Sequence, residues 1–304
     1  MLSPIASVTH AHLVYVLAQE LKTSHRDGDL QILDTGCGNG KLLLACHRHF
    51  PTLLDRAAAF SGFDVTDSRV QRSDFFDSTA SYLAEEAPNV DWTSRLRLIS
   101  TDTPWPYADR TFDATVSNQV LEHVIDVDFF IHELSRVLRP GGVSINLFPV
   151  VSLLVEGHVG VPLAHRISSD DVRRAYLSQF ARLGLSRLGP MRMSGSLSPE
   201  AFGVTRAEYV ATQTAYRSFR ELAKVAHRHG LTASYRWTPQ FYLLKLAYVL
   251  GRDLSRMYDR PLGTPLLEWL TFGLLSRLSS VTVVFAKDRG YDPDAVDAGH
   301  LSSA

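Results

Sequence analysis

Residues 32–41 read ILDTGCGNGK, and this glycine-rich segment constrains the fold more than any other part of the chain. The apolar run that ends at Asp34 predicts a short buried strand, and a helical pattern begins at Lys41. Glycines carry no Cβ, so the backbone between these elements can turn sharply and approach a bound molecule closely. The segment therefore predicts a strand, a tight turn and a helix. The turn is either a ligand site or a connection that binds nothing.

Two common nucleotide-binding turns do not fit this spacing. A P-loop has the pattern G-x-x-x-x-G-K-[ST], but position 35 is threonine and position 42 is leucine, so the metal-binding hydroxyl is missing. The dinucleotide pattern G-x-G-x-x-G places its third glycine at position 41, which is lysine. The pattern that remains is D-x-G-x-G-x-G, formed by Asp34, Gly36, Gly38 and Gly40.

Strands alternate with helical patterns along the first half of the chain, which predicts a parallel, doubly wound α/β sheet. Such sheets bind their ligands at the carboxyl ends of the strands. We assign residues 1–149 to this core. The expected strands are LQILDTG (30–36), AFSGFDV (59–65), RLRLIS (95–100), FDATVSN (112–118) and VSINLFP (143–149).

The second half of the chain has a looser pattern. We expect residues 150–205 to form a helical insertion that caps the substrate site over the carboxyl edge of the sheet. Residues 206–289 then complete the sheet with a helix over 206–229 and the strands LTASYRW and SVTVVFAKD. An apolar helical insertion, at about 239–278, lies between these strands. Residues 290–304 predict a disordered tail.

Charge and cysteine content narrow the functional classes. The 31 Lys and Arg residues nearly balance the 32 Asp and Glu residues, and the pI is about 6.9, so nucleic acid is not an expected partner. Cys37 and Cys46 are the only cysteines and predict reduced thiols. The start of the sequence has no secretory pattern, and no apolar run reaches the roughly 18–20 residues that span a bilayer. We therefore expect a cytoplasmic protein.

Four motifs occur in a specific order: D-x-G-C-G-x-G from Asp34, GFD ending at Asp64, FDATVSNQVLEHV (112–124) and LRPGG (138–142). This set resembles the class I S-adenosylmethionine-dependent methyltransferases, and within them the subgroup that acts on small molecules, lipids and glycans. The resemblance covers about residues 30–150 well and the last two strands loosely. It implies a Rossmann-like, seven-stranded, mostly parallel sheet with helices on both faces, and S-adenosylmethionine as cofactor.

The resemblance also implies a set of cofactor-binding residues. Asp64 lies 24 residues after Gly40, where a carboxylate accepts hydrogen bonds from a ribose diol. Asp102 matches the position that meets adenine, although its loop is one residue shorter than is usual in the family. Trp105 and Tyr107 either pack on the adenine or anchor the loop. The full set is Asp34, Gly36, Cys37, Gly38, Gly40, Asp64, Asp102, Thr103, Asn118 and Gln119.

If the acceptor of the methyl group is a hydroxyl, a general base that accepts its proton helps the transfer. Glu122 and His123 follow the fourth strand, and His158 lies in EGHVGVPLAH (156–165), which we expect to be a loop facing the acceptor. His158 is the preferred base, with His123 second. The alternatives are that Glu122 and His123 are structural and that the loop histidines are exposed to water.

No metal site is expected. A metal-dependent subset, the small-RNA 3′-end methyltransferases, carries E-x-x-E-H after the fourth strand together with a distant histidine. This chain has Gln119 at the first acid, followed by Glu122 and His123. Neutral glutamine is a poor ligand for a hard cation. An aminopropyl transferase is also disfavoured, because Asn118 and Gln119 do not provide the paired acids of those enzymes.

We therefore expect a methyltransferase that O-methylates a small-molecule or glycan acceptor. The alternatives are a catalytically silent module that binds S-adenosylmethionine, and a methyltransferase acting on a lipid-linked or RNA acceptor. Large apolar side chains in residues 241–278 predict a lid, a homodimer interface or a peripheral membrane contact.

Overall fold

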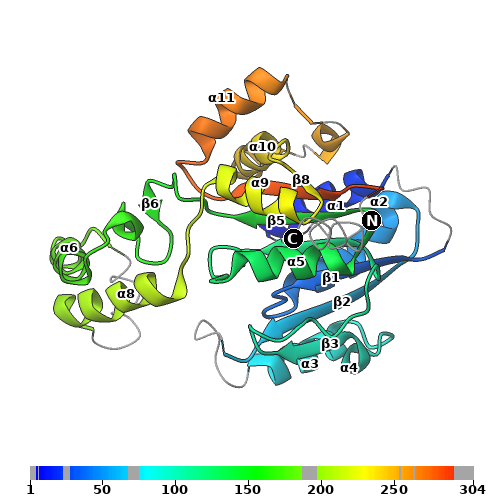
Figure 1. Ribbon diagram of the computed structural model, residues 1–304, viewed down its shortest axis with the longest axis horizontal. Coiled ribbons are helices and arrows are strands. Elements are labelled where there is room, and N and C mark those ends of the chain that lie inside the picture. The colour runs from blue at the N-terminus through cyan, green and yellow to red at the C-terminus, as the bar shows by residue number, and fades with distance from the viewer. Residues whose placement is uncertain are drawn as a thin grey trace, which may run out of the picture.

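A seven-stranded sheet with the order β3-β2-β1-β4-β5-β9-β8 forms the centre of the protein (Figure 1). The computed structural model describes residues 5, 7–22, 28–67, 75–186, 197–252, 255–259, 261–262 and 264–290. Only β9 runs antiparallel to its two neighbours, so the expected mostly parallel α/β sheet is confirmed. The strands are β1 (Leu30–Thr35), β2 (Ala58–Val65), β3 (Leu96–Ile99), β4 (Phe112–Asn118), β5 (Leu138–Phe148), β8 (Leu231–Ser234) and β9 (Val281–Lys287).

Helices cover both faces of the sheet, which is why its central strands are almost continuously buried. On one face, α1 and α2 pack with α10, and α3 and α4 extend the same apolar cluster. On the other face, α5 packs with α9. These helices are α1 (Val8–Leu21), α2 (Lys41–Leu54), α3 (Phe75–Glu86), α4 (Trp92–Arg95), α5 (Val127–Val137), α9 (Phe219–Arg228) and α10 (Thr238–Val249).

The order of the strands determines where on the sheet a ligand can bind. The order runs outward from β1 in both directions, so the connections after β1 and after β4 leave the carboxyl edge toward opposite faces. This reversal leaves a crevice at the switch point, where ligands bind in open α/β sheets. The motifs around Asp34, Asp64 and Asn118 lie at the ends of β1, β2 and β4 and therefore meet at this crevice.

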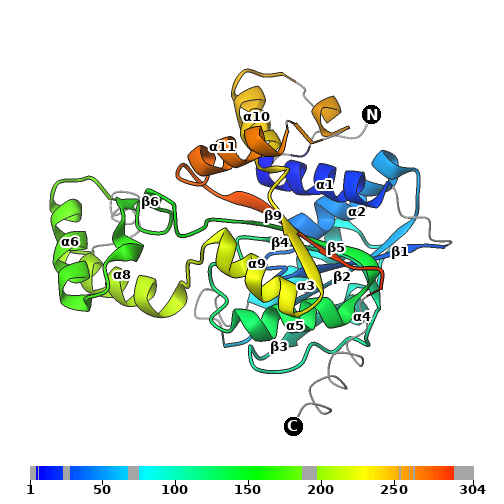
Figure 2. The ribbon, with the colours of Figure 1, turned by 45° about the horizontal axis from the view of Figure 1, so that its top comes forward.

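Residues 150–186 and 197–213 form a separate lobe that projects from the carboxyl end of β5 (Figures 1 and 2). The lobe has its own apolar cluster, which includes Val161, Leu177 and Phe202. Ser169 and Ser198 cap its two longer helices at their N-termini. Its elements are β6 (Val155–Glu156), β7 (Val161–Pro162), η1 (Ala164–Arg166), α6 (Asp170–Arg182) and α8 (Pro199–Gln213).

The structure differs from the sequence expectation at this lobe in two ways. The helix expected over 206–229 is two helices, because Thr214 is extended and Ser218 starts α9 with a capping box to Glu221. The insertion consequently runs past the expected boundary at residue 205, to the end of α8. In addition, the expected loop at 156–165 contains the β6–β7 hairpin.

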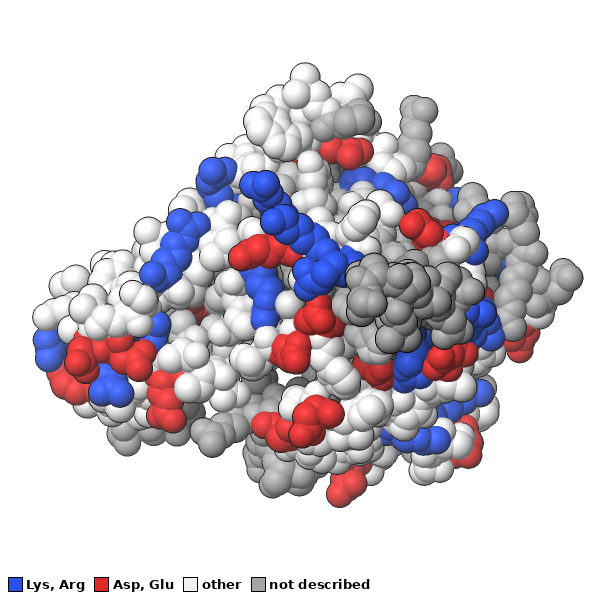
Figure 3. All heavy atoms as spheres, in the orientation of Figure 1, with Lys and Arg blue, Asp and Glu red and all other residues white. Residues whose placement is uncertain are grey.

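The apolar segment after β8 forms α10, η2 (Ser255–Tyr258) and α11 (Pro265–Leu275). None of the side chains described in α11 is buried, and Leu266, Trp269 and Leu274 are 62–66% exposed. The surface over this helix, at the top of Figure 3, is mostly uncharged. Helix α11 therefore carries an exposed apolar face. Whether this face is a lid, a homodimer interface or a membrane contact stays a prediction.

The expected disordered tail falls outside the described residues beyond residue 290. Among the residues that the structure describes, no helix combines the length and the apolar character needed to span a membrane. Cys37 and Cys46 are both buried and unpaired.

Candidate active site

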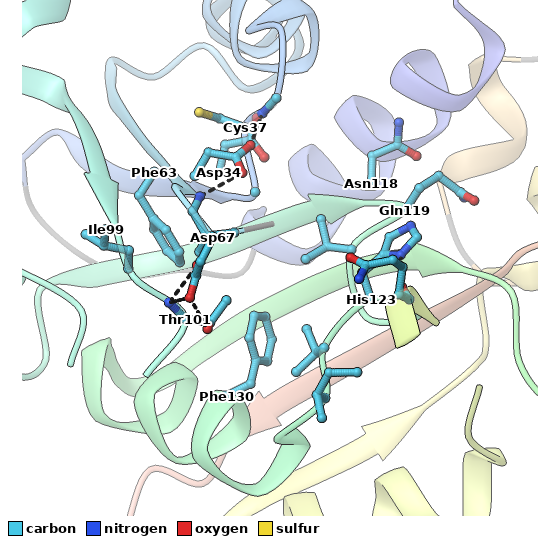
Figure 4. A pocket seen from close by; sticks show the side chains of 18 of the residues that line it. Asp34, Cys37, Phe63, Asp67, Ile99, Thr101, Asn118, Gln119, His123 and Phe130 are labelled. Atoms are coloured by element: carbon cyan, nitrogen blue, oxygen red, sulfur yellow. Dashed lines mark hydrogen bonds between the residues drawn. The ribbon is translucent and has the colours of Figure 1, made fainter. Parts of the chain in front are cut away.

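A cavity of about 800 Å³ opens at the switch point between β1 and β4 and extends to the lobe. Figure 4 shows Asn118, Gln119 and His123 on one side of it, and Phe63, Asp67 and Thr101 on the other. The lobe contributes His158 from its hairpin and Tyr209 from α8. The cavity therefore connects the sequence motifs of the core with residues of the insertion.

Asp34 lies at the inner wall of this cavity, at the end of β1. Its side chain is 1% exposed, and neither carboxylate oxygen has a hydrogen-bond partner. Burial, together with the negative charge of Asp64, raises the pKa of Asp34 to about 8. A buried carboxylate without donors is costly, so this position favours a cationic ligand that brings its own N–H groups.

The glycine turn leaves room for that ligand. Gly36 has a φ of +75°, and a Cβ there would come within 2.6 Å of the side chain of Val120. Gly40 also has a positive φ, but it begins α2 and packs toward Leu83 and Thr79 rather than lining the cavity. The first part of the motif therefore faces the cavity, and its last glycine shapes the helix start.

Asp64 lies at the end of β2, and the turn holds it in place. The backbone N–H of Gly38 donates to Asp64 Oδ2 at 2.7 Å, and that of Val65 donates to Oδ1 at 2.8 Å. Burial raises the pKa of Asp64, and these two hydrogen bonds partly oppose that rise. Each oxygen keeps a lone pair, so the fixed carboxylate suits a ligand with two adjacent hydroxyls.

An aromatic wall continues from Asp64. The rings of Phe63 and Trp105 lie 4.7 Å apart between centroids, and those of Trp105 and Phe130 lie 5.2 Å apart. All three line the cavity. Tyr107 does not line it and donates its hydroxyl to the carbonyl of Gly62, so it anchors the loop. The position of Trp105 is compatible with packing on an adenine, whereas Tyr107 is placed to anchor the loop.

Asp102 is exposed at the rim of the cavity, and Thr103 lies outside its lining. Sequence reasoning missed a nearby pair. The backbone N–H and the hydroxyl of Thr101 donate to Asp67, at 3.1 and 2.6 Å (Figure 4). Desolvation acts to raise the pKa of Asp67, but hydrogen bonds from Thr101 and Ser100 lower it overall. Both residues line the cavity, but no motif marks them in the sequence.

At the end of β4, Asn118 has a buried side-chain oxygen without a partner and lines the cavity. Gln119 has a φ of +59°, a left-handed conformation that is uncommon for a residue other than glycine. Its amide nitrogen donates to the carbonyl of Leu147 and to the hydroxyl of Ser280. The backbone therefore turns abruptly here and leads into Glu122 and His123.

The far end of the cavity is a polar cluster from both parts of the protein. His123 Nδ1 donates to the carbonyl of Gln213 at 2.6 Å, and His158 Nδ1 donates to Glu156 at 2.7 Å. The hydroxyl of Tyr216 also donates to Glu156. Burial acts to raise the pKa of Glu156, but the hydrogen bonds from His158 and Tyr216 lower it overall. Glu156 is therefore a carboxylate that orients His158.

Glu122 lies just behind the cavity wall and is 1% exposed. Neither of its carboxylate oxygens has a hydrogen-bond partner, and burial raises its pKa to about 8. Burial also lowers the pKa of His123. One ligand atom from each of Glu122, His123 and His158 lies within 4.8 Å of the others. The three candidates for catalysis are thus brought together, although 35 residues separate His123 from His158.

His165, in the same sequence segment, packs its ring on Tyr216 and does not line the cavity. The structure instead adds residues that sequence reasoning did not select. His10 comes from α1, and Tyr209, Thr212 and Gln213 come from α8. The predicted residues that do line the cavity are Asp34, Gly36, Cys37, Gly38, Asp64, Asp102, Asn118, Gln119, His123 and His158.

Part of this chain is similar to known proteins. Residues 33–146 match the family described as methyltransferase domain. A curated relative is the mitochondrial ubiquinone biosynthesis O-methyltransferase of Homo sapiens, 27% identical over 55% of this chain and 43% of the relative. Another is the ubiquinone/menaquinone biosynthesis C-methyltransferase UbiE of Desulfotalea psychrophila, 28% identical over 49% and 56%. The chain thus spans about half the length of these relatives.

Among solved structures, the YcgJ protein from Bacillus subtilis is similar over 92% of this chain and 99% of that chain, with 15% identity and a TM-score of 0.47. The sheet order, the motif positions and the family match together define the core. Over residues 33–146 it is a methyltransferase domain of the class I S-adenosylmethionine-dependent type. The unpartnered Asp34, the fixed Asp64 and the aromatic wall fit the ammonium, ribose and adenine of that cofactor.

Proposed function

We propose that this protein transfers the methyl group of S-adenosylmethionine to an oxygen atom of a small-molecule acceptor. One observation carries the proposal: a single cavity runs from Asp34 and Asp64 to His123 and His158. A cofactor held by the first pair would therefore share this cavity with a polar cluster built partly by the lobe. The acceptor enters between the loop after β4 and the lobe.

The residues of the chain mainly bind and orient. When bound, S-adenosylmethionine supplies a methyl group on a positively charged sulfur, and transfer breaks that carbon–sulfur bond as the acceptor oxygen bonds to the carbon. Asp34 pairs with the ammonium and Asp64 with the ribose hydroxyls. The aromatic wall excludes water from the adenine, and positioning supplies much of the rate.

An acceptor hydroxyl must also lose its proton. His158 is oriented for this role, because Glu156 holds Nδ1–H and leaves Nε2 free to accept. Glu156 also stabilises the imidazolium that forms. His123 has the same orientation through the carbonyl of Gln213, so a second imidazole lies beside the first.

The names of the relatives favour a small acceptor, since they include an O-methyltransferase and a C-methyltransferase of quinone biosynthesis. They give no support to a glycan acceptor. The net charge of −1 disfavours RNA. A cytoplasmic location stays a prediction, because a relative named above is mitochondrial.

The test is formation of S-adenosylhomocysteine when the full chain is incubated with S-adenosylmethionine and a panel of phenols, catechols and hydroxy acids. We expect turnover with at least one member of the panel. His158→Gln should lower kcat about 100-fold and leave the cofactor Kd unchanged. His165→Gln is the matched control, because His165 lies nearby but outside the cavity. Tight cofactor binding without turnover on oxygen, nitrogen or carbon acceptors would instead support a silent module.

A further inference from the structure

We propose that Glu122, His123 and His158 bind a divalent transition-metal ion of the zinc type. Gln119 replaces an acid of the metal-binding pattern, which argues against a metal site in the sequence, but the site proposed here does not use Gln119. Its amide nitrogen is engaged by Leu147 and Ser280. Three potential ligands remain together without it, with one donor atom from each lying within 4.8 Å of the other two.

The two imidazoles are oriented as metal-bound histidines usually are. A ligating histidine commonly donates its other ring N–H to a carbonyl or a carboxylate, which fixes the ring and its tautomer. Here the carbonyl of Gln213 receives His123 Nδ1–H, and Glu156 receives His158 Nδ1–H. Glu156 is in turn held by the hydroxyl of Tyr216. In both rings Nε2 is therefore the nitrogen with its lone pair available.

Glu122 provides a second, independent observation. The residue is 1% exposed, and both carboxylate oxygens lack a hydrogen-bond partner. A buried carboxylate in this state is expensive, and a bound cation would remove the cost. The Glu122 carboxylate lies close to ring nitrogens of His123 and His158, and neutral imidazoles do not balance its negative charge. A cation bound between the three side chains would balance it.

The ligand set also indicates which ion fits. Mg²⁺ and Ca²⁺ prefer all-oxygen surroundings, whereas two imidazoles and one carboxylate are typical of Zn²⁺ and related ions. Three protein ligands leave at least one coordination position open, as in catalytic rather than structural zinc sites. His123 and His158 both line the cavity, so the open position faces the place where the acceptor binds.

This arrangement deepens the proposed function, and only its effect on the acceptor rests on that function. In a metal-loaded protein, an acceptor hydroxyl would occupy the open position. The ion would lower the pKa of that hydroxyl, and the proton would pass to water. His158 would then act as a ligand rather than as the base. Metal binding itself does not depend on the acceptor and is measured without it.

The test begins with the full chain stripped by EDTA and moved to chelator-free buffer. Titration calorimetry with Zn²⁺ should give one ion per chain at micromolar affinity or tighter, with Mg²⁺ at least about 100-fold weaker. Glu122→Gln and His158→Asn should each weaken Zn²⁺ binding about 100-fold, and Glu156→Gln should weaken it about tenfold. His165→Asn should leave it unchanged.

Two controls separate the possible failures. Glu122→Gln loses no hydrogen bond, so circular dichroism and S-adenosylmethionine titration should show an intact fold and cofactor site. Absence of stoichiometric Zn²⁺ binding by the wild type, or equal binding by Glu122→Gln, would refute the metal site. If methyl transfer proceeds at full rate in the stripped protein, the role of the metal in activating the acceptor is refuted and the proposed function stands. If Zn²⁺ binds as described but no acceptor is methylated, the metal site stands and the proposed function fails.

Discussion

Replacing Asp34 with asparagine should stabilise the protein without its cofactor and remove much of its affinity for that cofactor. The pKa of Asp34 rises from 3.8 to about 8 on folding because the carboxylate is buried, without partners and near Asp64. The folded chain therefore holds this proton more tightly than the unfolded chain. Stability contributed by the protonated form is complete below pH 3.8 and is lost as the pH rises toward 8.

The magnitude follows from this shift. At pH 7 the solution is about 3 pH units above the unfolded pKa, and each unit corresponds to about 1.4 kcal/mol, so ionisable Asp34 costs about 4 kcal/mol of the free energy of unfolding. Asparagine avoids this cost, but its buried amide still lacks partners, which costs about 1–3 kcal/mol. The expected net gain at pH 7 is about 1–3 kcal/mol.

Urea unfolding of both proteins at pH 4.5 and pH 8, without cofactor, measures the effect. The advantage of Asp34→Asn should grow with pH. Asp113→Asn is the matched control, because Asp113 is also a buried aspartate but pairs with Arg139 and accepts the N–H of Gln31, and its loss should destabilise. A variant that is less stable at pH 8, or a difference that does not change with pH, would refute the reasoning.

Three further outcomes follow from particular contacts. Glu156→Gln removes the carboxylate that orients His158, and it should lower kcat at least about tenfold in a methyl-transfer assay while calorimetry shows an unchanged cofactor Kd. His12→Ala leaves the buried hydroxyls of Tyr258 and Thr282 without their shared partner, and urea unfolding should show a loss of about 2–4 kcal/mol. The double change Trp269→Ser and Leu270→Ser should alter stability by less than about 0.5 kcal/mol, because both side chains are more than half exposed. It should also reduce vesicle co-sedimentation or self-association of the protein. Unchanged behaviour in both assays would show that this face has no such partner.

The parts of the fold that the sequence predicted are those with strong local signals. The glycine turn after Asp34 and the alternation of strands and helices fix the parallel core, because each strand end carries its own turn residues. Asp34 and Asp64 follow neighbouring strands, so their meeting at one edge follows from topology alone. The two helices α8 and α9 were read as one because both carry helical patterns, while the break depends on a single cap at Ser218.

The polar end of the cavity was less predictable. Gln119 in place of an acid argued against a metal site, because the sequence motif compares only residues that follow the same strand. The proximity of His158 to His123 depends instead on how the lobe folds back over the sheet, and on Glu156 and Gln213 holding the two rings. His10 and Tyr209 come from helices far from any motif, so no local pattern marks them.

The most direct test of the central claim is calorimetric titration with S-adenosylmethionine and S-adenosylhomocysteine, on the wild type and on Asp64→Ala. The account predicts micromolar binding of both ligands by the wild type. It also predicts a loss of at least about tenfold, or about 1.4 kcal/mol, in the variant, because Asp64 offers a fixed carboxylate to the ribose. No binding by the wild type, or equal binding by Asp64→Ala, would contradict the assignment of this cavity as the cofactor site.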